Sequence, residues 1–218
     1  MKKELTGLLF DNDGVLIDSM PGALRAWVKW GEVYHPGFAL TPEFHGRRAS
    51  DIVKDMVTPE EFQASYDYIN LLEIAESAST RPLPGTLEFL AQLPAGHWNI
   101  VTGANPELAK VRLDAAGIQI PETLVTAYDA KNGKPDPEPY LLGAAKIGID
   151  VSECAVFEDA PAGLIAGQRA GAALLVGIGE QTLESVADVV IESLSGLKYH
   201  GNVLEIPDEL RLRYSWLK

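Results

Sequence analysis

The chain has 218 residues and is 46% hydrophobic, which predicts a globular protein with a large core. Its formal charge of -13 at pH 7 opposes non-specific binding to nucleic acid or to an anionic membrane, so an anionic substrate needs local positive charge. No apolar run approaches the roughly 18 residues of a membrane span, and Glu4, Asp11 and Asp13 interrupt any apolar leader. We therefore expect a cytoplasmic protein that binds neither nucleic acid nor membrane.

Short apolar segments alternate with helical patterns along most of the chain, which is typical of a parallel sheet with crossover helices. The predicted strands are 5–10, 98–102, 123–126, 155–157, 173–176 and 189–191. The predicted helices, each followed by a glycine, are 106–116, 137–147 and 161–170. In the first helix, Leu108, Val111 and Ala115 recur at helical spacing, so we expect them on its buried face.

Residues 18–80 interrupt this alternation, because they have helical periodicity and few strand candidates. The turn-rich segments DSMPG and STRPLPG flank the interruption. Trp27, Trp30 and Tyr34 fall on one face of a predicted helix, where a packed aromatic stripe is expected. We therefore predict a core domain of residues 1–17 and 81–218 with an inserted helical domain of residues 18–80. The tail, residues 199–218, indicates only a further strand and a short terminal element.

Reactive or phosphate-binding residues follow several predicted strands, at the edge where ligands bind in open α/β sheets. The segments are Asp11-Asn12-Asp13-Gly14, Thr102-Gly103-Ala104-Asn105, Gly133-Lys134-Pro135-Asp136 and Glu158-Asp159. Each segment alone is also typical of a turn or of a helix start. Their joint placement at the ends of predicted strands indicates a phosphoryl-transfer site.

Asp11 and Asp13 are expected to point to the same side of the chain, because alternate residues of an extended segment share a face. A carboxylate is ionised at neutral pH, so Asp11 can attack phosphorus directly and form an aspartyl-phosphate. Asp13 would donate a proton to the leaving alcohol and later take one from water. Phosphate oxygens would be held by the hydroxyl of Thr102 and by the amides of Gly103 and Ala104.

Charge repulsion among Asp11, Asp13, Asp159 and an incoming phosphate predicts a bound cation, and an all-oxygen cluster suits octahedral Mg²⁺. Asp11 and Asp159 are the expected carboxylate ligands. Glu158 would bind the ion through water or would hold Lys134. The ammonium of Lys134 would offset negative charge on both the nucleophile and the transferring phosphoryl group, which it would also bind.

The segments DNDGVLIDS, VTGAN, GKPDPEPY and VFEDAPAGLIAG resemble, in this order, the four motifs of the haloacid dehalogenase superfamily. GKPDPEPYLLGA and EDAPAG are similar to its branch of sugar phosphatases, glycerol-phosphate phosphatases and β-phosphoglucomutases. The resemblance implies a Rossmann-like parallel sheet core with helices on both faces and an α-helical, C1-type cap inserted after the first motif. It also implies that Asp11 is the nucleophile and that Asp13 is the acid/base, which gives Mg²⁺ its backbone carbonyl.

The segment EFHGRRASDIV occupies the place of the family's substrate-specificity loop and supplies the positive charge that an anionic substrate requires. We expect His45 and Arg47 to bind substrate, with Arg48 a weaker candidate and a solvated basic turn the alternative. Mutase relatives have a Lys-Gly loop at this place, whereas this chain has His45 and Gly46. Hydrolysis is therefore favoured over isomerisation.

Together these features predict a Mg²⁺-dependent phosphatase, monomeric or weakly dimeric, that acts on a small sugar or polyol phosphate. A β-phosphoglucomutase-type isomerase is the first alternative. A non-catalytic phosphate-sensing module is an alternative of another class, but it would need neither a cap nor the intact pair Asp11 and Asp13.

Overall fold

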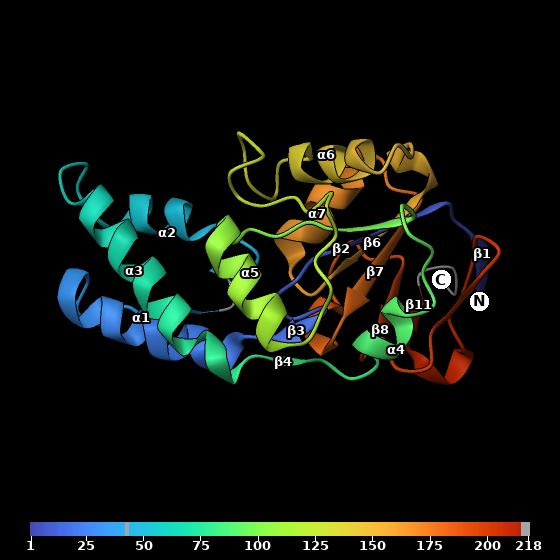
Figure 1. Cartoon of the computed structure of the whole chain (residues 1–218), viewed down its shortest axis with the longest axis horizontal. Coiled ribbons are helices and arrows are strands. Elements are labelled where there is room, and N and C mark those ends of the chain that lie inside the picture. Colours follow the sequence, from blue (N-terminus) through green and yellow to red (C-terminus); the bar gives the residue numbers. More distant parts are fainter. Residues whose placement is uncertain (42–43, 215–218) are drawn as a thin grey trace.

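The computed structural model describes residues 1–41 and 44–214, which form a sheet-containing core and a group of helices beside it (Figure 1). The central sheet has six strands in the order β11-β8-β7-β6-β2-β5. Its parallel strands are β2 (Gly7–Phe10), β5 (Trp98–Ile100), β6 (Cys154–Glu158), β7 (Leu174–Ile178) and β8 (Val189–Ile191). Strand β11 (Arg211–Tyr214) pairs antiparallel with β8. The predicted parallel sheet is thus confirmed, with one antiparallel edge strand.

Helices cover both faces of this sheet, as predicted. Every residue of β2, β6, β7 and β8 is buried, which is the pattern of parallel strands sandwiched between helices. One apolar cluster joins the sheet to α6 (Glu138–Lys146) and α7 (Pro161–Ala170). Another joins its opposite face to α4 (Thr86–Leu90) and α5 (Pro106–Ala115). The 3-10 helices include η2 (Ser77–Ser79), η3 (Val151–Glu153), η4 (Glu180–Thr182) and η5 (Asp208–Leu210).

The predicted strand 189–191 has the observed bounds, whereas the other five predicted strands differ from the observed ones, and two of these differences are informative. The strand predicted from residue 5 begins at Gly7, because the Leu5 amide donates at 2.7 Å to the carbonyl of Asn202, in a turn of the tail. The strand predicted over 123–126 is reduced to a single parallel bridge between Val101 and Val125. Both strands were predicted from runs of apolar residues. Such residues can be buried without pairing with a neighbouring strand.

The tail contributes more regular structure than its sequence indicates. Strands β9 (Lys198–His200) and β10 (Val203–Glu205) form an antiparallel sheet with β1 (Lys2–Glu4). Strand β11 then returns to the central sheet. Residues 215–218 lie outside the described residues. The described part of the tail therefore ties the first strand of the chain to the end of the core.

The buried face of α5 differs from the predicted one. Leu108 is buried, but Val111 is only partly buried and Ala115 is exposed, whereas Arg112 and Leu113 are buried. The prediction is right for Leu108 and wrong for Val111 and Ala115, because apolar spacing alone left Arg112 out of the buried face. Arg112 points inward to the carboxylates of Asp13 and Glu73. The buried face of α5 therefore includes Arg112 instead of Val111 and Ala115.

The helices α1 (Met20–Tyr34), α2 (Ala49–Met56) and α3 (Phe62–Glu76) pack beside the core, on the left of Figure 1. They share an apolar cluster built around Trp27 and Trp30, whose rings are 5.1 Å apart. The Trp30 indole donates to Ser65 Oγ at 2.9 Å, which satisfies its buried N–H. We propose that residues 18–80 form a cap domain, as their helical pattern predicts.

The chain leaves and re-enters the core at one place. Strands β3 (Ile17–Asp18) and β4 (Arg81–Pro82) pair antiparallel there, with Ile17 opposite Pro82. The two connections between core and cap are therefore adjacent. No helix in the part of the chain that the structure describes is long and apolar enough to cross a membrane.

Candidate active site

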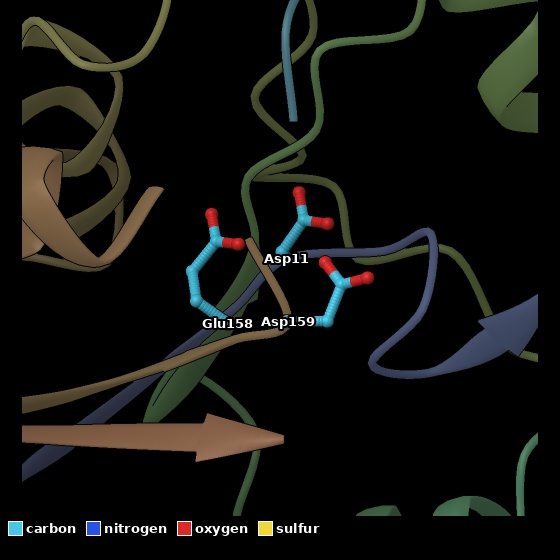
Figure 2. Close-up of side chains that lie close together, drawn as sticks. All are labelled: Asp11, Glu158 and Asp159. Atoms are coloured by element: carbon cyan, nitrogen blue, oxygen red, sulfur yellow. The ribbon is translucent and has the colours of Figure 1, made fainter. Parts of the chain in front are cut away.

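The candidate site lies at the carboxyl ends of β2 and β6, which are neighbours in the sheet. β2 ends at Phe10, which Asp11 follows, and β6 ends at Glu158, which Asp159 follows. The pairing of Phe10 with Phe157 brings these carboxylates together, and Figure 2 shows all three pointing to the same side. One oxygen from each carboxylate lies within 4.8 Å of those of the other two. Segments far apart in the sequence thus form one buried acidic cluster.

The ammonium of Lys134 lies inside this acidic cluster. It donates to Asp11 Oδ1 at 2.5 Å and to the Val101 carbonyl at 3.0 Å, and it pairs with Glu158 Oε1 at 2.7 Å. A lysine has three N–H donors, so the protein engages all of them. A phosphate oxygen would have to share one of these protons. Lys134 therefore binds the Asp11 carboxylate, and any contact with a phosphate would be additional.

The cluster carries more negative charge than Lys134 balances. Burial raises the pKa of Asp11 to about 7, although the charge of Lys134 acts in the opposite direction. Burial also raises the pKa of Asp159 well above its usual value, and the charges of Asp11 and Glu158 add to this effect. A further positive charge would favour the ionised carboxylates. An oxygen-only donor set of this kind fits a divalent cation.

Two glycines make room for these carboxylates. A Cβ on Gly14, whose φ is +83°, would collide with the carboxylate of Asp159. A Cβ on Gly163 in α7 would likewise collide with the carboxylate of Glu158. Glu158 also accepts a hydrogen bond of 2.6 Å from the Tyr140 hydroxyl. The close approach of α7 to β6 thus holds Glu158 where it can pair with Lys134.

Asp13 lies beside the cluster and has a different environment. Its Oδ1 accepts hydrogen bonds from Ser19 Oγ at 2.5 Å and from Arg112 Nη1 at 2.9 Å. Within residues 1–41 and 44–214, its Oδ2 has only contacts of 3.4 Å, with Thr102 Oγ1 and with Asn12 Nδ2. The side chain is 27% exposed and lines a cavity of the site. Asp11 lines the same cavity but is only 6% exposed, so Asp13 is the more accessible of the two carboxylates.

The predicted phosphate-binding segment after β5 lies beside Asp13. Thr102 is buried, and its hydroxyl oxygen accepts a hydrogen bond from the Ala104 amide at 3.1 Å. Asn105 caps α5 by accepting a hydrogen bond from the Leu108 amide at 2.9 Å. The carbonyls of the 46–47 loop pass 3.7 Å from the position of a Cβ on Gly103. The cap therefore lies directly over this segment.

A cavity of about 110 Å³ separates the cap from the core above these residues. Its lining includes the predicted substrate residues His45 and Arg47. The guanidinium of Arg47 donates to Asp55 Oδ2 at 2.6 Å and lies 5.9 Å from the centre of the Phe44 ring. Arg47 thus pairs with a carboxylate within the cap. A substrate that bound Arg47 would have to share its guanidinium with Asp55.

Arg48, the weaker substrate candidate, connects the cap to the core. It donates to both carboxylate oxygens of Asp51, at 2.8 and 3.2 Å. It also donates to the carbonyls of Ala130 and Lys131, at 3.2 and 3.3 Å. The loop that carries Lys134 follows directly. The basic cap segment is therefore not a solvated turn at this position.

Two charged residues of the site, Arg112 and Glu73, are not among the residues predicted from the sequence. Arg112 Nη2 donates to Glu73 Oε1 at 3.0 Å, and both side chains are buried. Burial by itself lowers the pKa of Arg112, but the charges of Asp13 and Glu73 outweigh it and leave that pKa above its usual value. One signal was available, because Ser65, Ile69 and Glu73 follow at intervals of four residues on the buried face of α3.

Asn12 is the remaining polar residue of the first motif. Its side chain is fully buried, and its Oδ1 accepts no hydrogen bond within residues 1–41 and 44–214. Its backbone carbonyl accepts hydrogen bonds from the Leu16 amide at 2.9 Å and the Ile17 amide at 3.1 Å. The residue therefore shapes the turn after β2.

The chain is similar in sequence to a known protein family and to proteins of known activity. Residues 5–171 match the family model described as haloacid dehalogenase-like hydrolase. Hexitol phosphatase A of Escherichia coli strain K12 is 38% identical over 175 residues, which are 76% of this chain and 79% of that protein. Glycerol-1-phosphate phosphohydrolase 1 of Saccharomyces cerevisiae is 35% identical over 184 residues, which are 77% of this chain and 72% of that protein.

A solved structure shares the architecture as a whole. A β-phosphoglucomutase from Clostridium difficile superposes with a TM-score of 0.78, covering 89% of this chain and 94% of that chain. The two sequences are 22% identical, so this likeness concerns the fold alone.

Proposed function

Because this chain belongs to the haloacid dehalogenase-like hydrolases and is a phosphoric monoester hydrolase, we propose that it dephosphorylates a small sugar or polyol phosphate through an aspartyl-phosphate on Asp11. The observation that carries the proposal is the contrast between the two aspartates of the first motif. Both line the cavity between cap and core, but Asp11 is 6% exposed and paired with Lys134, whereas Asp13 is 27% exposed. The first is suited to bond with phosphorus and the second to exchange protons with a substrate or water.

In the first half-reaction, Asp11 attacks the phosphorus atom. Lys134 holds Oδ1, which leaves Oδ2 to form the new P–O bond. The bond between phosphorus and the leaving oxygen breaks as Asp13 donates its proton to that oxygen. The alcohol leaves, and Asp13 is left ionised.

In the second half-reaction, a water molecule attacks the phosphorus atom of the aspartyl-phosphate. Asp13 takes a proton from this water as the new P–O bond forms. The bond between phosphorus and Asp11 breaks, which regenerates the Asp11 carboxylate and releases inorganic phosphate. The protons therefore balance over one turnover, since Asp13 ends in the protonation state in which it began.

A divalent cation, Mg²⁺, would be held by the carboxylates of Asp11 and Asp159 and by the backbone carbonyl of Asp13. Bound there, it would supply the positive charge that lets Asp11 and a phosphate dianion approach each other. Glu158 would act by holding Lys134, because its Oε1 already accepts a hydrogen bond from the Tyr140 hydroxyl and pairs with the Lys134 ammonium.

The pocket supports a leaving group without a second phosphate. Arg47 is paired with Asp55, Arg48 with Asp51, and Arg112 with both Asp13 and Glu73. A bisphosphate would have to displace one of these carboxylates. The named relatives, a hexitol phosphatase and a glycerol-1-phosphate phosphohydrolase, also fit a hydroxyl-rich leaving group. These features favour hydrolysis over the isomerisation of a sugar phosphate.

The test is a phosphate-release screen over hexitol, hexose and glycerol phosphates, with Mg²⁺ or with excess chelator. We expect release of inorganic phosphate from at least one polyol or sugar phosphate only when the metal is present, and no turnover by Asp11→Asn. With a hexose 1-phosphate, accumulation of the 6-phosphate in the presence of a bisphosphate primer would favour the isomerase. Full activity in chelator would remove the metal from the mechanism.

A further inference from the structure

Asp13 is held by a buried arginine for which the reaction above has no task. Arg112, on α5, donates from Nη1 to Asp13 Oδ1 at 2.9 Å and from Nη2 to Glu73 Oε1 at 3.0 Å. The side chains of Arg112 and Glu73 are each 7% exposed. Glu73 lies on α3 of the proposed cap, whereas Asp13 and Arg112 belong to the core. A continuous line of alternating charges therefore runs from the cap to Asp13.

We propose that Arg112 is a positioning residue for Asp13 and that Glu73 fixes Arg112 in this position. The inference rests on the proposed function, because Asp13 needs a fixed orientation only if it transfers protons. Arg112 and Ser19 both bind Oδ1 of Asp13, at 2.9 and 2.5 Å. Among the residues that the structure describes, the other oxygen has only contacts of 3.4 Å. One oxygen is thus fixed, and the other is left to meet the leaving group or the attacking water.

The chemistry of arginine suits this task. A guanidinium presents its N–H groups in a rigid plane, so one side chain can bind a separate carboxylate at each end. A lysine at position 112 would carry one ammonium on a flexible stem and would not hold the two carboxylates in a fixed relation. Replacing Glu73 by glutamine would leave one end of the guanidinium without its charged partner, and the orientation of Arg112 would loosen.

Arg112 also lines the cavity, so direct contact with a substrate is the rival explanation. The two explanations differ in what they require of Asp13. A positioning residue acts through Asp13 and becomes nearly irrelevant once Asp13 has lost its function. A substrate-binding residue keeps its own effect whatever stands at position 13. This difference can be measured with a double-mutant cycle.

The first experiment follows 4-nitrophenyl phosphate in rapid mixing. 4-Nitrophenol is acidic enough to leave without a donated proton, so formation of the aspartyl-phosphate does not need Asp13. Hydrolysis of this intermediate does need Asp13 as a base. For Arg112→Lys and Arg112→Met we expect a burst of 4-nitrophenol close to one equivalent, followed by turnover that is about 100-fold or more slower than in the parent. Loss of the burst and the turnover together would overturn the proposal.

The second experiment compares two glutamates of α3. Glu73→Gln should give the same burst with slowed turnover, whereas Glu76→Gln should behave as the parent. Glu76 is a matched control, because it also pairs with two cations, Arg25 at 2.7 Å and Lys29 at 2.8 Å, but does not line the cavity. Parent-like turnover of a folded Glu73→Gln would overturn the role of Glu73. Thermal unfolding of each variant shows whether it is folded at the assay temperature. If Arg112→Met is unfolded at that temperature, the conclusion is drawn from Arg112→Lys.

Asp13→Asn separates this inference from the proposed function. If Asp13→Asn turns over at the parent rate, the acid/base role of Asp13 fails, and the positioning role of Arg112 with it, whereas the proposed function fails only if Asp11→Asn keeps turnover or no phosphate is released. If Asp13→Asn loses turnover but the Arg112 variants do not, only the positioning role is refuted. In the Asp13→Asn background, Arg112→Lys should lower turnover by less than about twofold further. Losses that multiply in the double variant would assign Arg112 to substrate binding instead.

Discussion

We predict that the metal-free protein becomes less stable as the pH rises from about 5.5 to about 7, and that Mg²⁺ removes most of this loss. The reason lies in Asp11, whose pKa burial raises from 3.8 to about 7. Between these values the folded protein keeps a proton that the unfolded chain has released. Because the folded state binds more protons in this range, raising the pH favours unfolding. A cation bound to Asp11 would favour the ionised carboxylate and cancel the effect.

The size of the effect follows from the shift. Each pH unit over which the folded and unfolded states differ by one proton changes the free energy of unfolding by about 1.4 kcal/mol. From about pH 5.5 to about 7, Asp11 alone contributes about 2 kcal/mol, and Asp159, whose pKa is shifted in the same direction, adds to it. For a domain of this size, the unfolding midpoint should fall by about 4 to 8 °C.

The assay is thermal unfolding followed by circular dichroism, in chelator and in excess Mg²⁺, at both pH values. Asp11→Asn is the control, because an amide does not titrate and should remove the Asp11 contribution to the pH dependence. A midpoint in chelator that stays constant or rises with pH would refute the reasoning. So would a fall of equal size in Asp11→Asn, since other groups would then be responsible.

Three further substitutions test the site. Lys134→Met should lower kcat by at least about 100-fold, because Asp11 loses the cation that holds it, and steady-state kinetics on the best substrate would show whether it does. Gly163→Ala should destabilise the protein by about 1 to 3 kcal/mol in urea unfolding, since the added Cβ displaces the Glu158 carboxylate; an unchanged midpoint would contradict the close approach of α7. Arg47→Ala should lower kcat/KM for the best metabolite by about 10- to 100-fold but leave 4-nitrophenyl phosphate nearly unchanged. If Arg47→Ala and the parent have equal kcat/KM on the metabolite, Arg47 does not bind the substrate, and its role is limited to the ion pair with Asp55.

The sequence was informative wherever function depends on residues next to strand ends. Asp11, Glu158 and Asp159 could be placed together because parallel strands end at a common edge of the sheet. Lys134 could be expected near them because its own segment follows a strand candidate, even though that candidate forms only an isolated bridge.

The sequence was less informative about contacts between cap and core. The partners of Arg112 lie 99 and 39 residues away, on elements whose relative placement no local pattern specifies. Apolar spacing alone also left Arg112 out of the buried face of α5, which is why the predicted face was wrong for Val111 and Ala115. Glu73, four residues after Ile69 on the buried face of α3, was a local sign that a partner of opposite charge was needed.

The antiparallel pair β3 and β4 has a consequence for how such proteins diversify. Because Ile17 faces Pro82 where the chain enters and leaves the cap, the two ends of the inserted segment are already joined. A different cap of any length can in principle be grafted between these ends without disturbing the sheet or the residues that transfer the phosphoryl group. The ion pair between Arg112 and Glu73 limits this freedom. A transplanted cap without a carboxylate at that position would leave a buried guanidinium half-paired, so α5 and the cap are expected to change together.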